Sequence, residues 1–323
     1  MTNHGLLADP LLDELDLDYE GLRVAAIGGG HGLAQALLAV QDYADVITAV
    51  VSVADDGGSS GRLAPGLGIP PPGDLRMALT ALSPEPSLWR DLIAYRFEAA
   101  DIQGHSLGNL IIAALTDLLG DFEEALATVG RHLGARGDVL PASPQPLGLE
   151  ATVDGAEVAG QVAIARSRGR IEELRIVPAD AAASPGALRA IAAADQIVIG
   201  PGSLFTSLIA VLKVPGIVEA VNASPASLAY VCNLATQDGE TLGLDAVAHV
   251  RAFAEHAGMR LPDAVVLHDG MVDVPPPVEP IRPDREGLAA LGVRVEAADL
   301  ADPAAAWPCH HPVRLGGVLR RLA

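Results

Sequence analysis

Two buried strands, joined by a glycine-rich turn and a helix, constrain the fold most. Residues 23–27 (Arg-Val-Ala-Ala-Ile) have the apolar character of a buried strand, and residues 28–32 (Gly-Gly-Gly-His-Gly) end it. A helical pattern follows over 33–40, and a second apolar strand over 46–53. A strand, a helix and a strand in this order form a βαβ unit, which implies a parallel sheet. The chain is therefore predicted to be an α/β protein.

The alternation of strands and helices continues beyond this unit. We expect further helices at 75–82 (with Asp74 as N-cap), 87–98, 110–119, 122–133, 186–193, 204–212, 241–257 and 312–322. We expect further strands at 196–199, 217–222, 264–268 and 294–297. Residues 149–177 differ, because short alternating segments (149–153, 157–165 and 171–177) are separated by hairpin-type turns. The prediction is a doubly wound, mainly parallel Rossmann-like sheet with a small antiparallel β insertion.

A chain of 323 residues is long enough for one large α/β domain or two smaller ones. We expect a short acidic leader over 1–20 and one domain over 21–323 that contains the insertion. Prolines 141, 144 and 146 indicate a linker before the insertion.

Composition narrows the class of partner. The net charge of −20 argues against nucleic acid and anionic membranes, since an acidic surface repels both. Half of the residues are apolar but only 3% are aromatic, so the core must be aliphatic. Two cysteines make neither a disulfide framework nor a usual zinc site. Because no signal peptide and no run of 18 apolar residues is found, we expect a cytoplasmic protein without membrane insertion.

The first glycine-rich turn suits an anion. Glycines let the backbone approach a diphosphate, and the helix that follows offers free N–H groups and a favourable dipole. The spacing departs from the dinucleotide fingerprint, because Leu33 stands where the last glycine belongs. A tight strand-to-helix turn without a ligand remains the alternative. The candidate ligand residues here are Gly28, Gly29, Gly30, His31 and Gly32.

The second strand ends in two adjacent carboxylates, Asp55 and Asp56. Gly57, Gly58 and Gly61 follow around the hydroxyls of Ser59 and Ser60, which is typical of a ligand loop at the edge of a parallel sheet. An acid at this place can accept hydrogen bonds from ribose hydroxyls, and a carboxylate pair can also hold Mg²⁺. A flexible surface loop, or an acid that braces a loop, is the alternative.

A third turn, at 200–203, again lies between a strand and a helix. Gly200 and Gly202 shape it, Ser203 is expected to cap the helix, and Thr206 can turn its hydroxyl towards the same anion. Two such turns can meet where a doubly wound sheet reverses direction, which is the usual ligand position. We therefore predict that both turns hold one pyrophosphate.

A fourth helix start carries His105 and Asn109. The histidine can protonate a leaving group or bind phosphate, and the amide can contact a base or a ribose. Ser106 with Asn109 can equally be a helix cap. Arg62 and Arg76 are the nearest basic candidates for a phosphate, with surface ion pairing as the alternative for each. Walker A, Gly-x-Ser-x-Gly and His-Glu-x-x-His patterns are absent from the sequence.

Taken together, these segments resemble the YvcK family of gluconeogenesis factors, whose fold is shared with 2-phospho-L-lactate transferase (CofD). The match covers roughly residues 22–268. It is carried by the blocks at 27–33, 53–63, 71–76, 104–109, 200–207 and 236–241. The sequence departs from the family's usual residues at His31, Met77 and Asp238.

The resemblance implies a cytoplasmic protein that binds a nucleotide-sugar, namely a UDP-sugar. It also implies support for cell-wall precursor supply and cell shape during gluconeogenic growth. The alternative is a Mg²⁺-dependent transferase with a nucleoside diphosphate donor, in which Asp55 and Asp56 hold the metal and His105 is the acid. An NAD-linked oxidoreductase ranks last. We also expect a homo-oligomer, specifically a dimer.

Overall fold

The computed structural model describes residues 21–323, so the expected leader at 1–20 lies outside the described residues. Its strands are β1 (Arg23–Gly28), β2 (Val46–Val51), β3 (Asp138–Pro141), β4 (Gly148–Val153), β5 (Ala156–Ala159), β6 (Ile171–Val177), β7 (Gln196–Ile199), β8 (Ser227–Val231), β9 (Ala264–His268) and β10 (Arg294–Ala298).

The helices before the insertion are α1 (Gly30–Val40), α2 (Gly58–Leu67), α3 (Gly73–Leu82), α4 (Leu88–Ala94), α5 (Leu107–Leu119) and α6 (Phe122–Leu133). Within and after the insertion they are α7 (Gln161–Ala165), α8 (Pro185–Ala193), η2 (Leu204–Ile209), α9 (Ala210–Leu212), α10 (Ile217–Ala223), α11 (Ala246–Ala252), η3 (Phe253–Ala257), α12 (Arg285–Ala290) and α13 (Pro312–Leu319). The segments η2 and η3 are wider, π-helical turns.

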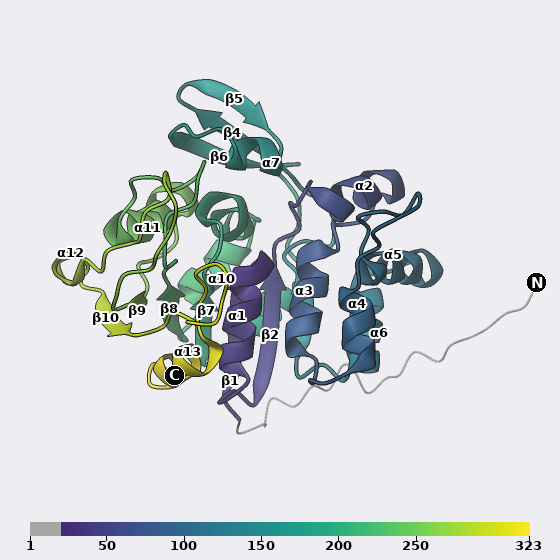
Figure 1. Cartoon of the computed structure of the whole chain (residues 1–323), viewed down its shortest axis with the longest axis horizontal. Helices are drawn as coiled ribbons and strands as arrows, with labels where there is room; N and C mark the ends of the chain where they lie inside the picture. The colour runs from purple at the N-terminus through teal and green to yellow at the C-terminus, as the bar shows by residue number, and fades with distance from the viewer. Residues whose placement is uncertain (1–20) are drawn as a thin grey trace, which may run out of the picture.

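Seven strands form one parallel sheet in the order β10-β9-β8-β7-β1-β2-β3. From β1 the chain moves outward to β2 and β3, and it then returns past β1 to β7 and continues the other way. Because such crossovers are right-handed, the helices cover both faces: α1 and α3 pack together on one, α8 and α10 on the other (Figure 1). This confirms the doubly wound α/β fold.

The direction reverses between β1 and β7, which are hydrogen-bonded neighbours. Each of these strands is followed by a glycine-rich turn, so the two turns lie side by side at the carboxyl edge of the sheet. Ligands of doubly wound proteins bind at this point. The central strands carry aliphatic side chains that are almost wholly buried, such as Ile27, Val50 and Val198.

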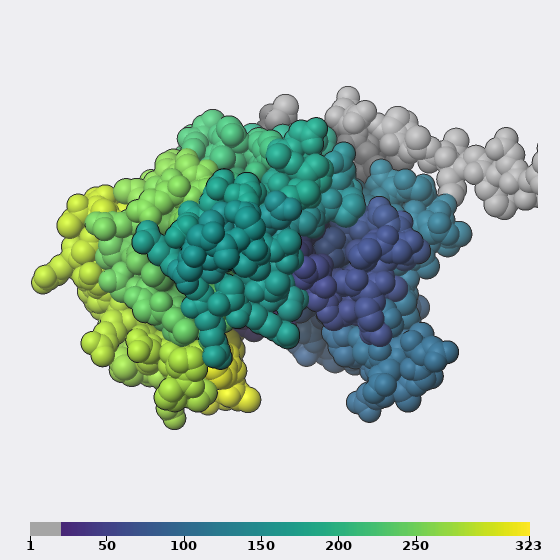
Figure 2. Space-filling model, turned by 90° about the horizontal axis from the view of Figure 1, so that it is seen from above, coloured from purple at the N-terminus to yellow at the C-terminus, as the bar shows by residue number. Residues whose placement is uncertain are grey.

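Residues 148–177 form the expected small antiparallel sheet, in the order β5-β4-β6. It stands above the carboxyl edge of the main sheet in Figure 1 and covers much of that edge when the molecule is viewed from above (Figure 2). The segment expected as a strand over 157–165 is in fact split, because Gly160 (φ +97°) ends β5 and begins α7.

Three further local predictions were wrong. Residues 217–222 form α10 instead of a strand: Gly216 (φ +96°) turns the chain, its N–H donates to the Glu219 carboxylate, and β8 follows only later. The Gly-Gly-Ser-Ser-Gly segment opens helix α2 and is not a loop.

Asp74 is not an N-cap, because Pro72 takes that position and Asp74 lies inside the first turn of α3. Of the prolines expected to indicate a linker, Pro141 ends β3, the edge strand paired with β2, whereas Pro144 and Pro146 lie in the irregular segment 142–147 that leads into the insertion.

Among residues 21–323, no single helix is long and apolar enough to cross a membrane. The helical segments Leu204–Leu212 and Ile217–Ala223 are together long and apolar enough, but the chain bends by 74° between them.

Candidate functional site

A polar cavity of about 300 Å³ lies where β1, β2 and β7 end. It is lined by Gly29, Gly30, His31, Gly32, Ser52, Asp55, Asp74, Met77, Gln161, Gly202, Ser203, Thr206, Ser207 and Gln237. The structure thus brings the first and third glycine-rich turns to one cavity. Gly28 and Gly200 shape these turns without lining it.

The first turn offers free backbone donors. Gly29 is the N-cap of α1, and Gly30 takes a left-handed φ of +62° that favours glycine. Within residues 21–323, the N–H groups of His31 and Gly32 have no hydrogen-bond partner. They lie in the first turn of an 11-residue helix, where the helix dipole favours a negative charge. This end of α1 is therefore suited to a phosphate.

The two turns touch closely. A Cβ atom built on Gly32 would lie 1.9 Å from the carbonyl oxygen of Pro201, a distance that no real side chain tolerates. The glycine therefore lets the start of α1 sit directly against the turn after β7. No anion needs to be present for the two turns to meet.

In the third glycine-rich turn, which follows β7, the hydrogen-bonding groups are already paired with other groups of the protein. The Glu240 carboxylate accepts hydrogen bonds from the N–H groups of Phe205 (3.0 Å) and Thr206 (3.2 Å) and from the Thr206 hydroxyl (2.5 Å). The Asn233 side chain pairs with both the N–H and the carbonyl of Gly202. Ser203 takes the N-cap position but makes no capping bond, and its hydroxyl accepts one from Gln237.

This changes the prediction for the third turn. Glu240 acts as an internal anion at the start of η2, so the amides expected for a phosphate there are taken. Burial raises the pKa of Glu240, and the three hydrogen bonds around its carboxylate oppose that rise. Thr206 lines the cavity but its hydroxyl donates to Glu240. The free donors of the site are thus mainly those of the first turn.

Two carboxylates line the cavity, but they are Asp55 and Asp74. Burial, together with the nearby charge of Asp55, raises the pKa of Asp74 to about 7, although a backbone hydrogen bond from Gly30 and the charge of Arg76 oppose the rise. Burial also raises the pKa of Asp55, against hydrogen bonds from Gly57 and Ser60. Two carboxylates with raised pKa values in one cavity suit a cation such as Mg²⁺.

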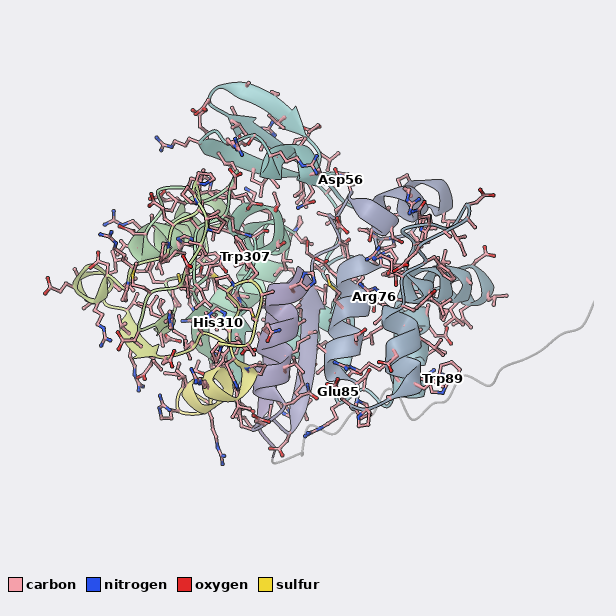
Figure 3. The ribbon with its side chains drawn as sticks, in the orientation of Figure 1. Asp56, Arg76, Glu85, Trp89, Trp307 and His310 are labelled. Carbon is pink, nitrogen blue, oxygen red and sulfur yellow. The ribbon has the colours of Figure 1, made fainter. Side chains whose placement is uncertain are left out.

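Asp56 does not belong to this pair. It is absent from the cavity lining, and its Oδ1 accepts a hydrogen bond from the N–H of Val162 in α7 (2.9 Å). Figure 3 shows Asp56 between α2 and the insertion. Asp56 thus tethers the insertion, and a metal pair within the cavity would be Asp55 with Asp74 instead of Asp56. From the same helix, Gln161 lines the cavity and donates to Thr206 (3.2 Å).

Five further predicted residues, Ser60 among them, lie outside the cavity lining. The Ser59 hydroxyl bonds His105 (3.1 Å) and accepts from Asn109 (3.1 Å), whose oxygen accepts from Arg76 (3.1 Å), in a buried network between α2, α3 and α5. Arg62 instead donates to the carbonyl of Gln103. Burial, with Arg62 and Arg96, lowers the pKa of His105.

Ser60, by contrast, serves the cavity indirectly. Its hydroxyl accepts from the N–H of Gly73 (3.1 Å), which fixes the start of α3, and it bonds the Asp55 carboxylate.

A larger cavity of about 840 Å³ adjoins the polar one. The two share His31, Gly32, Gly202 and Gln237. Its wall also includes Trp307, which is 54% exposed, and the buried His310, both on the C-terminal segment in front of the sheet (Figure 3). The Nε2 atom of His310 has no hydrogen-bond partner among the described residues, and burial lowers its pKa to about 4.

Sequence reasoning missed several lining residues. Ser52 and Gln161 stand in segments read as strands, and Trp307 lies in a stretch without a motif. Glu240 was within a block used for the resemblance, but without a role. Its neighbourhood, Gln237-Asp238-Gly239-Glu240, was the available signal.

Comparison with known proteins identifies the family of the chain. Residues 24–301 match the family described as 2-phospho-L-lactate transferase CofD. A relative from Bacillus subtilis (strain 168) named "Gluconeogenesis factor" is 42% identical, covering 84% of this chain and 89% of the relative. One of the same name from Halalkalibacterium halodurans is also 42% identical, covering 84% and 87%.

A solved structure of a related protein has the same fold. The crystal structure of a member of the UPF0052 family from Bacillus halodurans has a TM-score of 0.88 at 38% identity, covering 92% of this chain and 98% of that one.

The fold and site define a doubly wound Rossmann-like protein with a glycine-lined cavity at the switch point of its sheet. The chain belongs to the CofD family and, within it, to the YvcK group of gluconeogenesis factors.

Proposed function

We propose that the protein binds a nucleoside diphosphate-sugar, specifically a UDP-sugar, and acts as a regulator rather than as a catalyst. The observation that carries the proposal is the pair of free N–H groups at His31 and Gly32, set at the switch point of the sheet. An acidic protein can hold a diphosphate there because backbone donors and the α1 dipole act locally, whatever the net charge.

The adjoining larger cavity supports a ligand with more than phosphates. Its volume of about 840 Å³ falls in the range usual for organic ligands, and it shares lining residues with the polar cavity. Trp307, which is 54% exposed in the wall of this cavity, offers a flat face for a base. We place the diphosphate at α1 and the nucleoside beside Trp307.

Isothermal titration calorimetry tests this proposal. UDP-glucose and UDP-N-acetylglucosamine are titrated against the GDP and adenine analogues, with and without Mg²⁺, and product formation is followed in parallel. The proposal expects selective UDP-sugar binding without turnover. His31 is exposed, so it can be replaced without disturbing the core. The matched variants His31→Gln and His31→Glu have side chains of similar size, but only the glutamate carries a negative charge that repels a diphosphate. Equal affinity of both variants would refute the placement.

A Mg²⁺-dependent transferase is the second candidate, favoured by the Asp55 and Asp74 carboxylates in one cavity. The bound cation would supply charge neutralisation for a nucleoside diphosphate donor. These two side chains would hold it, and His105 has no place in such a site because it does not line the cavity. Metal-dependent loss of a guanosine diphosphate donor, abolished in Asp74→Asn, would support this candidate against the regulator.

The cellular role is a separate proposal, which the resemblance to the gluconeogenesis factors supports. We propose that ligand binding supports cell-wall precursor supply and cell shape during gluconeogenic growth, in the cytoplasm, with the protein acting as a homodimer. Gel filtration with light scattering tests the dimer. Growth of a deletion strain on gluconeogenic carbon, complemented with His31→Glu or His31→Gln, tests whether the cavity is needed for this role.

A further inference from the structure

A third cavity, of about 610 Å³, lies between the insertion and α11, and none of its lining residues lines the two cavities described above. Residues 168–171, at the start of β6, form one side. Helix α11 and the turn η3 form the other side. In Figure 2 the insertion lies beside this green helical region.

Cationic groups border this cavity although the chain as a whole is strongly acidic. The guanidinium groups of Arg170 and Arg251 have no hydrogen bond or ion pair within residues 21–323, and both side chains are exposed. Arg168 adds a third guanidinium, paired with Asp238 at 2.8 and 2.7 Å. The chain has only 21 lysines and arginines in all, so three around one cavity is a local concentration. Unpaired arginines facing a cavity suit a phosphate, which they bind in a bidentate manner.

Three carboxylates, those of Glu240, Asp245 and Glu255, line the same cavity and equal the three guanidinium groups in number. The Glu240 carboxylate is saturated by Phe205 and Thr206, and Asp245 caps α11 by accepting from the N–H of Ala248. Glu255 is exposed. His256 packs edge-on against Phe205 with ring centroids 5.0 Å apart, and both rings line the cavity.

The third cavity is linked to the candidate site by two routes. Phe205 and Glu240 line it, while Thr206, bonded to the same carboxylate, lines the candidate site. In addition, Arg168 and Arg170 follow α7, whose Gln161 reaches the candidate site. A ligand that joined Arg170 on the insertion to Arg251 on α11 would hold the insertion in place over the sheet edge.

We propose that this third cavity is a second ligand site, for a small phosphorylated metabolite, and that its occupation changes the affinity of the candidate site through Glu240 and Thr206. The coupling rests on the proposed function, whereas the second site does not. Coupling between two sites in one protein is typically 5- to 150-fold in affinity, roughly, and it is reciprocal.

Equilibrium dialysis with 2,3-bisphosphoglycerate tests the second site on the full chain. We expect the double variant Arg170→Ala/Arg251→Ala to weaken binding about tenfold or more. The matched control is Arg189→Ala/Arg320→Ala, which removes the same charge from two exposed arginines elsewhere. His31→Glu, at the candidate site, should leave this binding unchanged.

Three results would overturn the second site: no binding to the wild type at millimolar concentration, equal loss in both double variants, or loss in His31→Glu. For the coupling, the affinity for UDP-glucose is measured with and without the bisphosphate, and an unchanged affinity overturns it. If UDP-glucose binds under neither condition, the proposed function and the coupling fail together, while the dialysis still decides the second site.

Discussion

Replacing Gly32 by alanine should separate the two turns that form the candidate site. The added Cβ would lie 1.9 Å from the Pro201 carbonyl oxygen, 2.5 Å from its carbonyl carbon and 3.0 Å from the Gly202 nitrogen. Ordinary contact begins at 3.4 Å, so the turns must move apart by about 1.5 Å. Because all three contacts are with backbone atoms of the turn between β7 and η2, no flexible side chain can give way.

The cost has two parts. Overpacking of this kind typically destabilises by about 1–3 kcal/mol. The N–H groups of His31 and Gly32 also shift relative to Ser203, so we expect UDP-sugar affinity to fall at least tenfold, or about 1.4 kcal/mol. Urea denaturation and calorimetry measure the two effects separately.

The matched control is Gly200→Ala, in the turn against which Gly32 packs. Its Cβ would lie 3.5 Å from the Leu33 Cα atom, an ordinary contact, and its φ lies outside the left-handed range. We expect nearly unchanged stability and affinity for this control. If Gly32→Ala were as stable and as tight-binding as Gly200→Ala, the close approach of the turns would not matter and the reasoning would be wrong.

Three further predictions follow from single residues. Glu240→Ala leaves three donors around η2 unpaired and should cost roughly 3 kcal/mol of unfolding free energy. Glu240→Gln keeps one acceptor oxygen for the two N–H groups, and its NH2 can donate to the Thr206 hydroxyl, so it should cost under about 1 kcal/mol; equal losses by urea denaturation would contradict this. Asp74, with a pKa raised from 3.8 to about 7, binds a proton in the folded state that the unfolded chain has released, so stability should fall by roughly 2 kcal/mol from pH 5 to pH 8. Asp74→Asn should remove that part of the slope, and an unchanged slope would show that another group is responsible. In a Trp89→Phe variant, binding of a UDP-sugar should change the fluorescence of the remaining Trp307. In a Trp307→Phe variant, the fluorescence of Trp89, which is exposed on α4, should not change. The reverse pattern would show that the nucleoside does not bind in the larger cavity.

The overall fold was predictable because periodicity and glycine turns are local. The β1–α1–β2 unit, β7 and the hairpin insertion all carry their signal in a few neighbouring residues. The strand at 227–231 was missed because the apolar segment Ile217–Ala223 just before it looks equally β-like, and only the Gly216 turn and the Glu219 contact make it a helix. Propensity alone cannot separate two such adjacent segments.

The site was predictable only in part, for a related reason. Glycine turns at neighbouring strands indicate a cavity, and the sequence places both of them correctly. Which polar side chains enter the cavity depends on tertiary contacts: Asp56 turns to Val162, Ser59 turns to His105, and Asp74 joins Asp55 from another helix. The Glu240 carboxylate lies 34 residues beyond the Thr206 amide that it caps, a pairing that no local pattern reveals.

The central claim is that free amides at the start of α1 hold the diphosphate of a nucleotide-sugar. A crystal structure of the complex with UDP-N-acetylglucosamine measures this most directly. Phosphate oxygens within hydrogen-bond distance of the His31 and Gly32 nitrogens, with uracil beside Trp307, are the predicted result. Density for the diphosphate elsewhere, with these two amides still unpaired, would contradict it.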